Sequence, residues 1–256
     1  MRYFFHIAYQ GTQYRGWQWQ QQTSQTIQQF VEAGLNELIK AKVSLTACGR
    51  TDAEVHASQF FFHIDIEQEL PQNLVFILNK LWPSDICLYD IIPVHDTANA
   101  RFDAIERTYK YYIHRSINPF KKDCSSLYEE LNLDRGKIEK ALSILPQYDD
   151  FRAFCKQPEK HRTTICDIKS VTLQTDNFDQ IFNFEFKSNR YLRGMIRILV
   201  FRLLKVGSSE LSLDEFENYL ISKRSTEAVQ LAYPQGLYLT KVRYPYLDLP
   251  SRHIKP

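Results

Sequence analysis

Three side chains that can do chemistry lie close together in the segment from Gly49 to Ala57, namely Arg50, Asp52 and His56. The flanking segments have the patterns of regular structure, so the sequence predicts that this segment is a loop. An arginine two residues before an aspartate favours the ionised carboxylate, because a nearby opposite charge stabilises it. A charged and positioned carboxylate can act as a nucleophile or a general base. An isolated loop aspartate more often caps its own turn, so a role for Asp52 depends on its surroundings.

The elements around this loop follow from the spacing of apolar residues. Before the loop, the sequence predicts a strand at 2–9, a polar loop at 11–23 and a helix at 26–40. After it, we expect a strand at 59–66, a helix at 71–80 and a strand at 86–94. The first half of the chain therefore has the order strand, helix, candidate site loop, strand, helix, strand.

The second half has a similar plan. The predicted strands are 107–115, 163–174, 180–187 and 237–244, and the predicted helices are 134–145 (capped by Asp134), 189–206 and 213–222. The repeated order predicts an α+β fold of two similar lobes, each a mainly antiparallel sheet with helices packed on one face. We expect lobes at 1–103 and 104–256, and an active-site cleft between them.

The predicted helix at 189–206 carries an apolar stripe and a basic flank. At about 100° per residue, its apolar side chains gather in one arc that would face the core. Arg190, Arg193 and Arg197 fall together beside that arc. A solvated basic face is the simpler interpretation of such a helix. Arginines that border an apolar stripe also fit the edge of a cleft, where guanidinium groups meet phosphates and a carboxylate.

The composition is that of a globular protein, with 44% hydrophobic and 14% aromatic residues and a net charge of +2. Six basic residues and no acidic ones lie between Lys187 and Lys205, so this stretch can face a polyanion. The sequence shows no run of about 18 apolar residues and no secretory signal, so we expect a cytoplasmic protein without a membrane partner. The five cysteines are widely spaced, so we expect reduced thiols and no zinc site.

The segment from Gly49 to Ala57 resembles the active-site loop of the tRNA pseudouridine synthases of the TruA family, whose pattern is G-R-T-D-A-G-V-H-A. Eight of the nine positions match, and Glu54 stands where the family has glycine. Further resemblances follow in order along the chain: Tyr9–Thr12, Tyr14–Gln18, Ala100–Phe102, Arg107–Tyr111, Met195–Arg197, Gly236–Leu239 and Tyr244–Pro245. They extend from residue 9 to residue 245, and so over nearly the whole chain.

The resemblance implies a pseudouridine synthase fold and the isomerisation of uridine to pseudouridine at positions 38, 39 and 40 of tRNA. It implies that Asp52 is the nucleophile, that Tyr109 stacks on the target base and that Arg197 pairs with Asp52. Arg50 would enter the RNA helix near the target, and Arg190 and Arg193 are candidate RNA contacts. The same resemblance implies a homodimer that binds tRNA and uses no cofactor or metal.

Two departures from the family pattern and two alternative functions stay open. Glu54 would be costly if its position needs a positive φ, and Ile198 replaces a family asparagine next to Arg197. A non-catalytic RNA-binding protein on the same fold would keep the arginine-rich helix but would not need Asp52, Arg50 and Tyr109 together, and all three are present. A metal-dependent hydrolase would need further carboxylates or histidines at ligand spacing, and the seven histidines are scattered. We expect His56 to shape the loop by hydrogen bonding, and Trp17 and Trp19 to pack or to contact RNA.

Overall fold

The computed structural model describes the chain apart from residues 41, 68–69, 130–131, 226–227 and 251–256. Its contacts divide it into two compact units. Among the described residues, the first unit is Met1–Arg107 with residues 238–250, and the second is Thr108–Leu237. This division differs from the predicted lobes, because the last strand returns to the first unit. Among the described residues, no helix combines the length and the apolar character that a membrane span requires.

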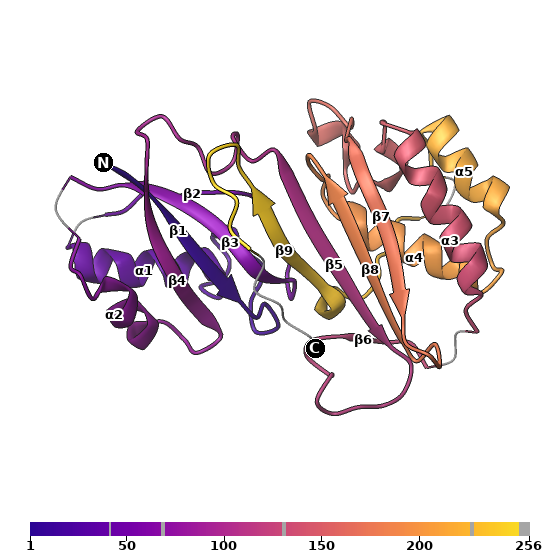
Figure 1. Cartoon of the computed structure of the whole chain (residues 1–256), viewed down its shortest axis with the longest axis horizontal. Coiled ribbons are helices and arrows are strands. Elements are labelled where there is room, and N and C mark those ends of the chain that lie inside the picture. Colours follow the sequence, from indigo (N-terminus) through magenta and orange to yellow (C-terminus); the bar gives the residue numbers. More distant parts are fainter. Residues whose placement is uncertain (41, 68–69, 130–131, 226–227, 251–256) are drawn as a thin grey trace. The chain divides into compact units, whose positions relative to one another are not determined.

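The first unit contains β-strands with two helices beside them (Figure 1). The strands are β1 (Arg2–Tyr9), β2 (Thr46–Ala47), β3 (His56–Asp65), β4 (Ile86–Val94) and β9 (Leu237–Arg243), and the helices are α1 (Ile27–Ile39) and α2 (Leu74–Leu81). The order along the sheet is β4-β1-β3-β9, with β2 also paired to β3. The β1–β3 and β1–β4 pairs are antiparallel, whereas β9 runs parallel to β3.

Both faces of the central strands of this sheet are buried. Because side chains alternate along a strand, neighbouring phenylalanines of β3 serve opposite faces. On one face Phe60 lies 4.2 Å from the ring of Trp17, which confirms that Trp17 packs in the core. On the other face Phe61 and Phe4 of β1 both contact Tyr244. The segments that follow β4 and β9 therefore cover the second face of the sheet.

The second unit contains further strands with three helices beside them (Figure 1). The strands are β5 (Glu106–His114), β6 (Ser126–Leu127), β7 (Ile168–Thr175) and β8 (Ile181–Ser188), and the helices are α3 (Arg135–Ile144), α4 (Met195–Gly207) and α5 (Leu213–Ser222). Single 3₁₀ turns lie at Leu145–Gln147, Arg152–Phe154, Pro158–Lys160 and Pro234–Gly236. The order is β5-β8-β7, with β6 paired to β5. Phe182, Phe184 and Phe186 of β8 are fully buried and alternate with half-buried polar residues, as expected of a sheet covered on one face.

The predicted α+β class and most predicted elements are confirmed, including the cap of α3 by Asp134; Thr26, expected inside its helix, proves to be the cap of α1. The side chain of Thr26 accepts from the backbone of Gln29 at the start of α1, and that of Asp134 accepts from Lys137 at the start of α3. The caps supply acceptors for backbone donors that have no partner within the helix.

The predicted helix at 189–206 begins too early. The observed helix α4 starts at Met195, because Gly194 has φ +71° and separates it from the preceding residues. The Ser188 hydroxyl donates to the carbonyl of Arg190, and Lys156 N–H donates to the carbonyl of Arg193. The expectation that Arg190 and Arg193 lie on one flank of this helix is therefore wrong, since both precede it.

The predicted strand at 163–174 also begins too early. The observed strand β7 starts at Ile168. The residues before it bond to another segment: Phe151 N–H donates to Thr164, and Cys166 N–H donates to Asp149. Residues 164–166 therefore pair with residues 149–151 and do not extend strand β7 as the apolar pattern predicted.

Candidate functional site

Two glycines of the opening segment hold the Asp52 loop in place. A Cβ added to Gly16 would lie 2.7 Å from the carbonyl oxygen of Thr51, and one added to Gly11 would lie 2.1 Å from that of Val55. Gly16 also has φ +91°, a backbone conformation that residues with a side chain rarely adopt. The two backbones therefore approach more closely than any other residue type at these two positions would allow.

Hydrogen bonds join the same two segments on both sides of Asp52. Trp17 N–H donates to Thr51 O at 3.2 Å, and Glu54 N–H donates to Tyr14 O at 3.1 Å. The hydroxyls of Tyr9 and Thr51 lie 2.8 Å apart in the interior. The backbone next to Asp52 is thus fixed from two directions, while its side chain stays half-buried.

His56 is a structural residue of this loop, as predicted. Its Nδ1 accepts the N–H of Gly11 at 3.0 Å, so the other ring nitrogen carries the proton in the neutral form. The ring stacks on Tyr238 of β9 with centroids 4.4 Å apart. His56 therefore ties the end of the loop to both the opening segment and the last strand.

Glu54 occupies a left-handed position, with φ +65°. This is the condition under which a glutamate was expected to be costly. A left-handed conformation costs a residue with a Cβ about 1–2 kcal/mol relative to the right-handed one, and glycine avoids the cost. The departure from the family glycine therefore introduces backbone strain two residues after Asp52.

Arg50 is exposed and lies beside Arg101. Burial of part of the side chain lowers the pKa of Arg50, and the positive charge of Arg101 lowers it further. The guanidinium of Arg50 is presented at the surface of the first unit, and its effect on Asp52 stays a prediction.

In the second unit, Tyr109 lies on β5 and contacts Tyr191. The two rings are 5.1 Å apart at 81°, an edge-to-face arrangement. Tyr109 is largely buried, and Tyr191 is half-buried in the loop at 189–194. The structure thus brings the candidate base-stacking tyrosine against a second aromatic ring between Arg190 and Arg193. Tyr191 was missed in the sequence, because a single tyrosine in a predicted helix carries no signal.

Arg197 lies in the first turns of α4 and is held by the segment before β9. Its Nε donates to Ala232 O at 2.7 Å, while Ala232 N–H donates to Arg197 O at 3.0 Å. Its positive charge acts on Tyr111 and Tyr128, although burial is the main cause of the raised pKa of both hydroxyls. These contacts fix the direction of the guanidinium group.

Arg190 and Arg193 belong to a basic loop next to the segment around residues 156–161. The side chain of Arg193 donates to Gln157 at 2.8 Å. Burial lowers the pKa of His161, and the charges of Arg190 and Arg193 lower it further. Both arginines therefore remain close together, although they do not share a helix face.

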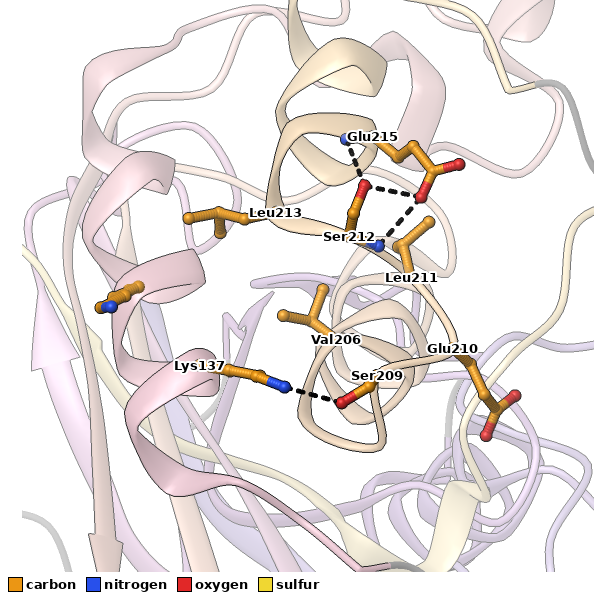
Figure 2. Close-up of a pocket in the computed structure, with 9 residues that line it drawn as sticks. Lys137, Val206, Ser209, Glu210, Leu211, Ser212, Leu213 and Glu215 are labelled. Atoms are coloured by element: carbon orange, nitrogen blue, oxygen red, sulfur yellow. Dashed lines mark hydrogen bonds between the residues drawn. The ribbon is translucent and has the colours of Figure 1, made fainter.

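The pocket in Figure 2 lies in the second unit, and none of the candidate site residues lines it. Lys137 donates to Ser209 at 2.8 Å, and Ser212 and Glu215 form a reciprocal cap at the start of α5. Its lining residues are Lys137, Lys140, Val206, Ser209, Glu210, Leu211, Ser212, Leu213 and Glu215. Of the hydrogen bonds drawn as dashed lines in Figure 2, the one between Lys137 and Ser209 connects α3 to the segment after α4, and those between Ser212 and Glu215 cap the start of α5.

The candidate residues are divided between the units. Asp52 and Arg50 lie in the first unit, whereas Tyr109, Arg197 and the basic loop lie in the second. In the parts of the chain that the structure describes, histidine, cysteine and acidic side chains form no group of three or more that could hold a metal ion. Burial raises the pKa of Cys48, just before the loop, to about 11, so its thiol stays protonated at neutral pH.

Known proteins that are similar to this chain carry the name tRNA pseudouridine synthase. A family model described as tRNA pseudouridine synthase matches residues 148–245. The chain is 38% identical over 246 residues to tRNA pseudouridine synthase A of Azobacteroides pseudotrichonymphae, covering 95% of this chain and 97% of that one. It is 35% identical over 248 residues to the protein of the same name from Porphyromonas gingivalis, again covering 95% and 97%. The similarity includes both units and the Asp52 loop, and the chain belongs to the tRNA pseudouridine synthase A family.

Proposed function

We propose that this protein isomerises uridine to pseudouridine in tRNA, with Asp52 as the nucleophile. The observation that carries the proposal is the Asp52 loop, held by Gly11 and Gly16, in a chain similar over 95% of its length to tRNA pseudouridine synthases A. A nucleophile needs a fixed backbone and a side chain within reach of substrate. The half-buried carboxylate of Asp52 on its cross-braced loop meets both needs.

The reaction is internally balanced. The bond between N1 of uracil and C1′ of ribose breaks, and a bond from C5 of the same base to C1′ forms. The hydrogen on C5 leaves as a proton, and N1 gains a proton, so no oxidant, reductant or further reactant is needed. Asp52 would hold one fragment covalently while the base turns, by adding either to C1′ of the ribose or to C6 of the base.

The other residues supply binding and orientation. Tyr109 would stack on the target base, since a flat ring holds a base and still lets it turn. Arg197 would pair with the Asp52 carboxylate, and Arg50 would enter the RNA helix and help to extrude the uridine. This arrangement requires a cleft between the two units. The support for it is that each unit holds a different part of the required chemistry.

The coupling of Asp52 to Arg197 can be tested by a double-mutant cycle. If the two side chains pair, the effects of Asp52→Asn and Arg197→Gln on tRNA affinity will not be additive. Additive effects would show that the two residues act separately, and Arg197 would then be assigned to phosphate. Arg193→Gln serves as the matched control, because that arginine lies in the neighbouring basic loop and is bonded to Gln157.

We further propose the uridines at positions 38, 39 and 40 as targets and a homodimer as the active form. Both follow from the family resemblance of the motifs. Light scattering during size-exclusion chromatography would give the mass of the particle, for which one chain contributes 30.3 kDa. A monomer that is fully active would contradict the proposed assembly.

The decisive experiment is incubation of the protein with an unmodified tRNA transcript, followed by carbodiimide treatment and primer extension. We expect stops that mark pseudouridine at positions 38–40. Asp52→Asn should abolish them while tRNA binding persists, because the substitution keeps the shape and removes the charge. Tight binding without any modification by the wild-type protein would instead indicate a non-catalytic RNA-binding protein.

A further inference from the structure

A tightly bonded turn at Asn99–Ala104 presents two side chains to solvent. The Asn99 side chain accepts the N–H groups of Arg101 and Phe102, at 3.0 and 3.1 Å. The Asp103 carboxylate accepts Asn99 N–H and the hydroxyl of Tyr246, each at 2.8 Å. The backbone of the turn is therefore fixed by its own side chains and by the segment after β9.

Two buried residues of the first unit, His63 and Tyr244, also hold this turn. The buried Nδ1 of His63 accepts Ala100 N–H at 3.1 Å, and the hydroxyl of buried Tyr244 donates to Ala100 O at 2.8 Å. These two contacts anchor the turn on the face of the sheet formed by Phe4, Phe61 and His63. A surface turn with so many partners is rigid.

Arg107 ties this turn to the Asp52 loop. One terminal nitrogen donates to Cys48 O at 2.8 Å and to Arg101 O at 2.9 Å, and the other donates to Ala104 O at 3.1 Å. Cys48 lies two residues before Arg50 in the chain. A single guanidinium group thus fixes the spacing between the candidate catalytic loop and the turn.

The side chains that the turn presents are not explained by the fold. Phe102 is 77% exposed, which is unusual for a large apolar side chain held by so rigid a backbone. Arg101 places its guanidinium 5.5 Å from the centre of the Phe102 ring. Among the residues that the structure describes, neither Arg50 nor Arg101 has an acidic partner. Two arginines without counter-charges and an exposed ring therefore lie next to the Asp52 loop.

We propose that Arg101 and Phe102 form an RNA-binding element beside the active site, in which Arg101 contacts a backbone phosphate and Phe102 stacks on the nucleotide next to the target uridine. This inference rests on the proposed function. Extrusion of a uridine leaves the neighbouring base with an unstacked face, at a cost of a few kcal/mol. A fixed aromatic ring adjacent to Arg50 can cover that face, and two unpaired guanidinium groups match a phosphate backbone.

The experiment measures the affinity of the Asp52→Asn protein for unmodified tRNA by fluorescence anisotropy over a range of salt concentrations. Arg101→Ala should weaken binding and lower the slope of log affinity against log salt by about one, because one phosphate is no longer neutralised. Arg101→Lys should restore the slope. Phe102→Leu should weaken binding about tenfold without changing the slope, whereas Phe102→Tyr should bind like the parent, because stacking requires a ring.

The matched controls are Arg135→Ala and Phe178→Ala. Arg135 is exposed but already paired with Glu139, and Phe178 is an 81% exposed phenylalanine of the second unit. We expect both controls to bind like the parent. A parental slope for Arg101→Ala, or parental affinity for Phe102→Leu, would overturn the proposal. If the wild-type protein forms pseudouridine in that case, the proposed function stands and only the inference about the turn fails.

Discussion

At the scale of single residues, Glu54 combines a strained backbone with a negative charge close to the candidate nucleophile Asp52. Its φ of +65° is the conformation that glycine adopts most easily, and its carboxylate adds a negative charge two residues from Asp52. The two effects can be separated, because glutamine removes the charge but keeps the side chain, whereas glycine removes both. Only the charge acts on a polyanionic substrate.

We therefore expect Glu54→Gln and Glu54→Gly to bind tRNA more tightly than the wild type at low salt, by similar factors. The stability of Glu54→Gly should stay within about 1 kcal/mol of the wild type, since relief of strain is offset by the greater freedom of the unfolded chain. Anisotropy and urea denaturation measure the two quantities. Tighter binding by the glycine variant alone would show that backbone strain, and not charge, limits affinity.

At the scale of elements, the sequence predicts what local patterns determine. The helices α1 and α3 were placed correctly, because Thr26 and Asp134 are good caps that precede periodic apolar residues. The start of α4 was not, because the apolar spacing continues through Leu192 although Gly194 interrupts the helix. The short strands β2 and β6 have two residues each and carry no period at all.

The candidate site shows the same limit. The residue types of its loop single out Asp52, and hydrogen bonding by His56 was predicted correctly. The part played by Gly11 and Gly16 could not be predicted, because it depends on a close approach between segments about 40 residues apart. Such contacts follow from packing and not from local pattern.

Gly16→Ala tests whether that approach matters. We expect a loss of at least about 1–2 kcal/mol of unfolding free energy, since alanine has to adopt a left-handed conformation. Activity should fall further than stability, because the new Cβ would push on the carbonyl of Thr51 next to Asp52. Urea denaturation and single-turnover assays give the two values. Gly136→Ala, in helix α3, is the control and should retain full activity.

The basic loop of the second unit makes a separate prediction about RNA binding. Arg190→Ala with Arg193→Ala should lower the slope of log affinity against log salt, by about 0.7–0.9 for each phosphate that the loop no longer neutralises. The measurement is tRNA anisotropy between low and physiological salt. Arg135→Ala again controls for the removal of an exposed arginine. An unchanged slope in the double variant would remove this loop from the RNA-binding surface.

At the scale of the whole molecule, buried titratable groups determine how stability depends on pH. Burial is the first cause of a lowered pKa for His63, His114 and His161, so each binds a proton less readily in the folded protein than in the unfolded chain. Burial also raises the pKa of Cys48 to about 11 and that of Tyr112 to about 12. The unfolded chain therefore takes up protons on its histidines more readily at low pH, and loses protons from its cysteine and tyrosine more readily at high pH. Both effects lower the free energy of unfolding.

The histidine contribution should be complete above their unfolded-state pKa of 6.5 and should decrease as the pH falls towards their folded-state values, because the unfolded chain then binds more protons. The cysteine contribution should be complete below its unfolded-state pKa of 9.0 and should decrease as the pH rises towards 11. We therefore expect maximal unfolding free energy between pH 6.5 and 9, measured by urea denaturation. His63→Asn keeps an acceptor for Ala100 N–H but cannot be protonated, so it should show a shallower decline as the pH falls from about 6.5 to about 5.5. An equal decline in this variant would show that His63 does not link the fold, and with it the Arg101–Phe102 turn, to pH.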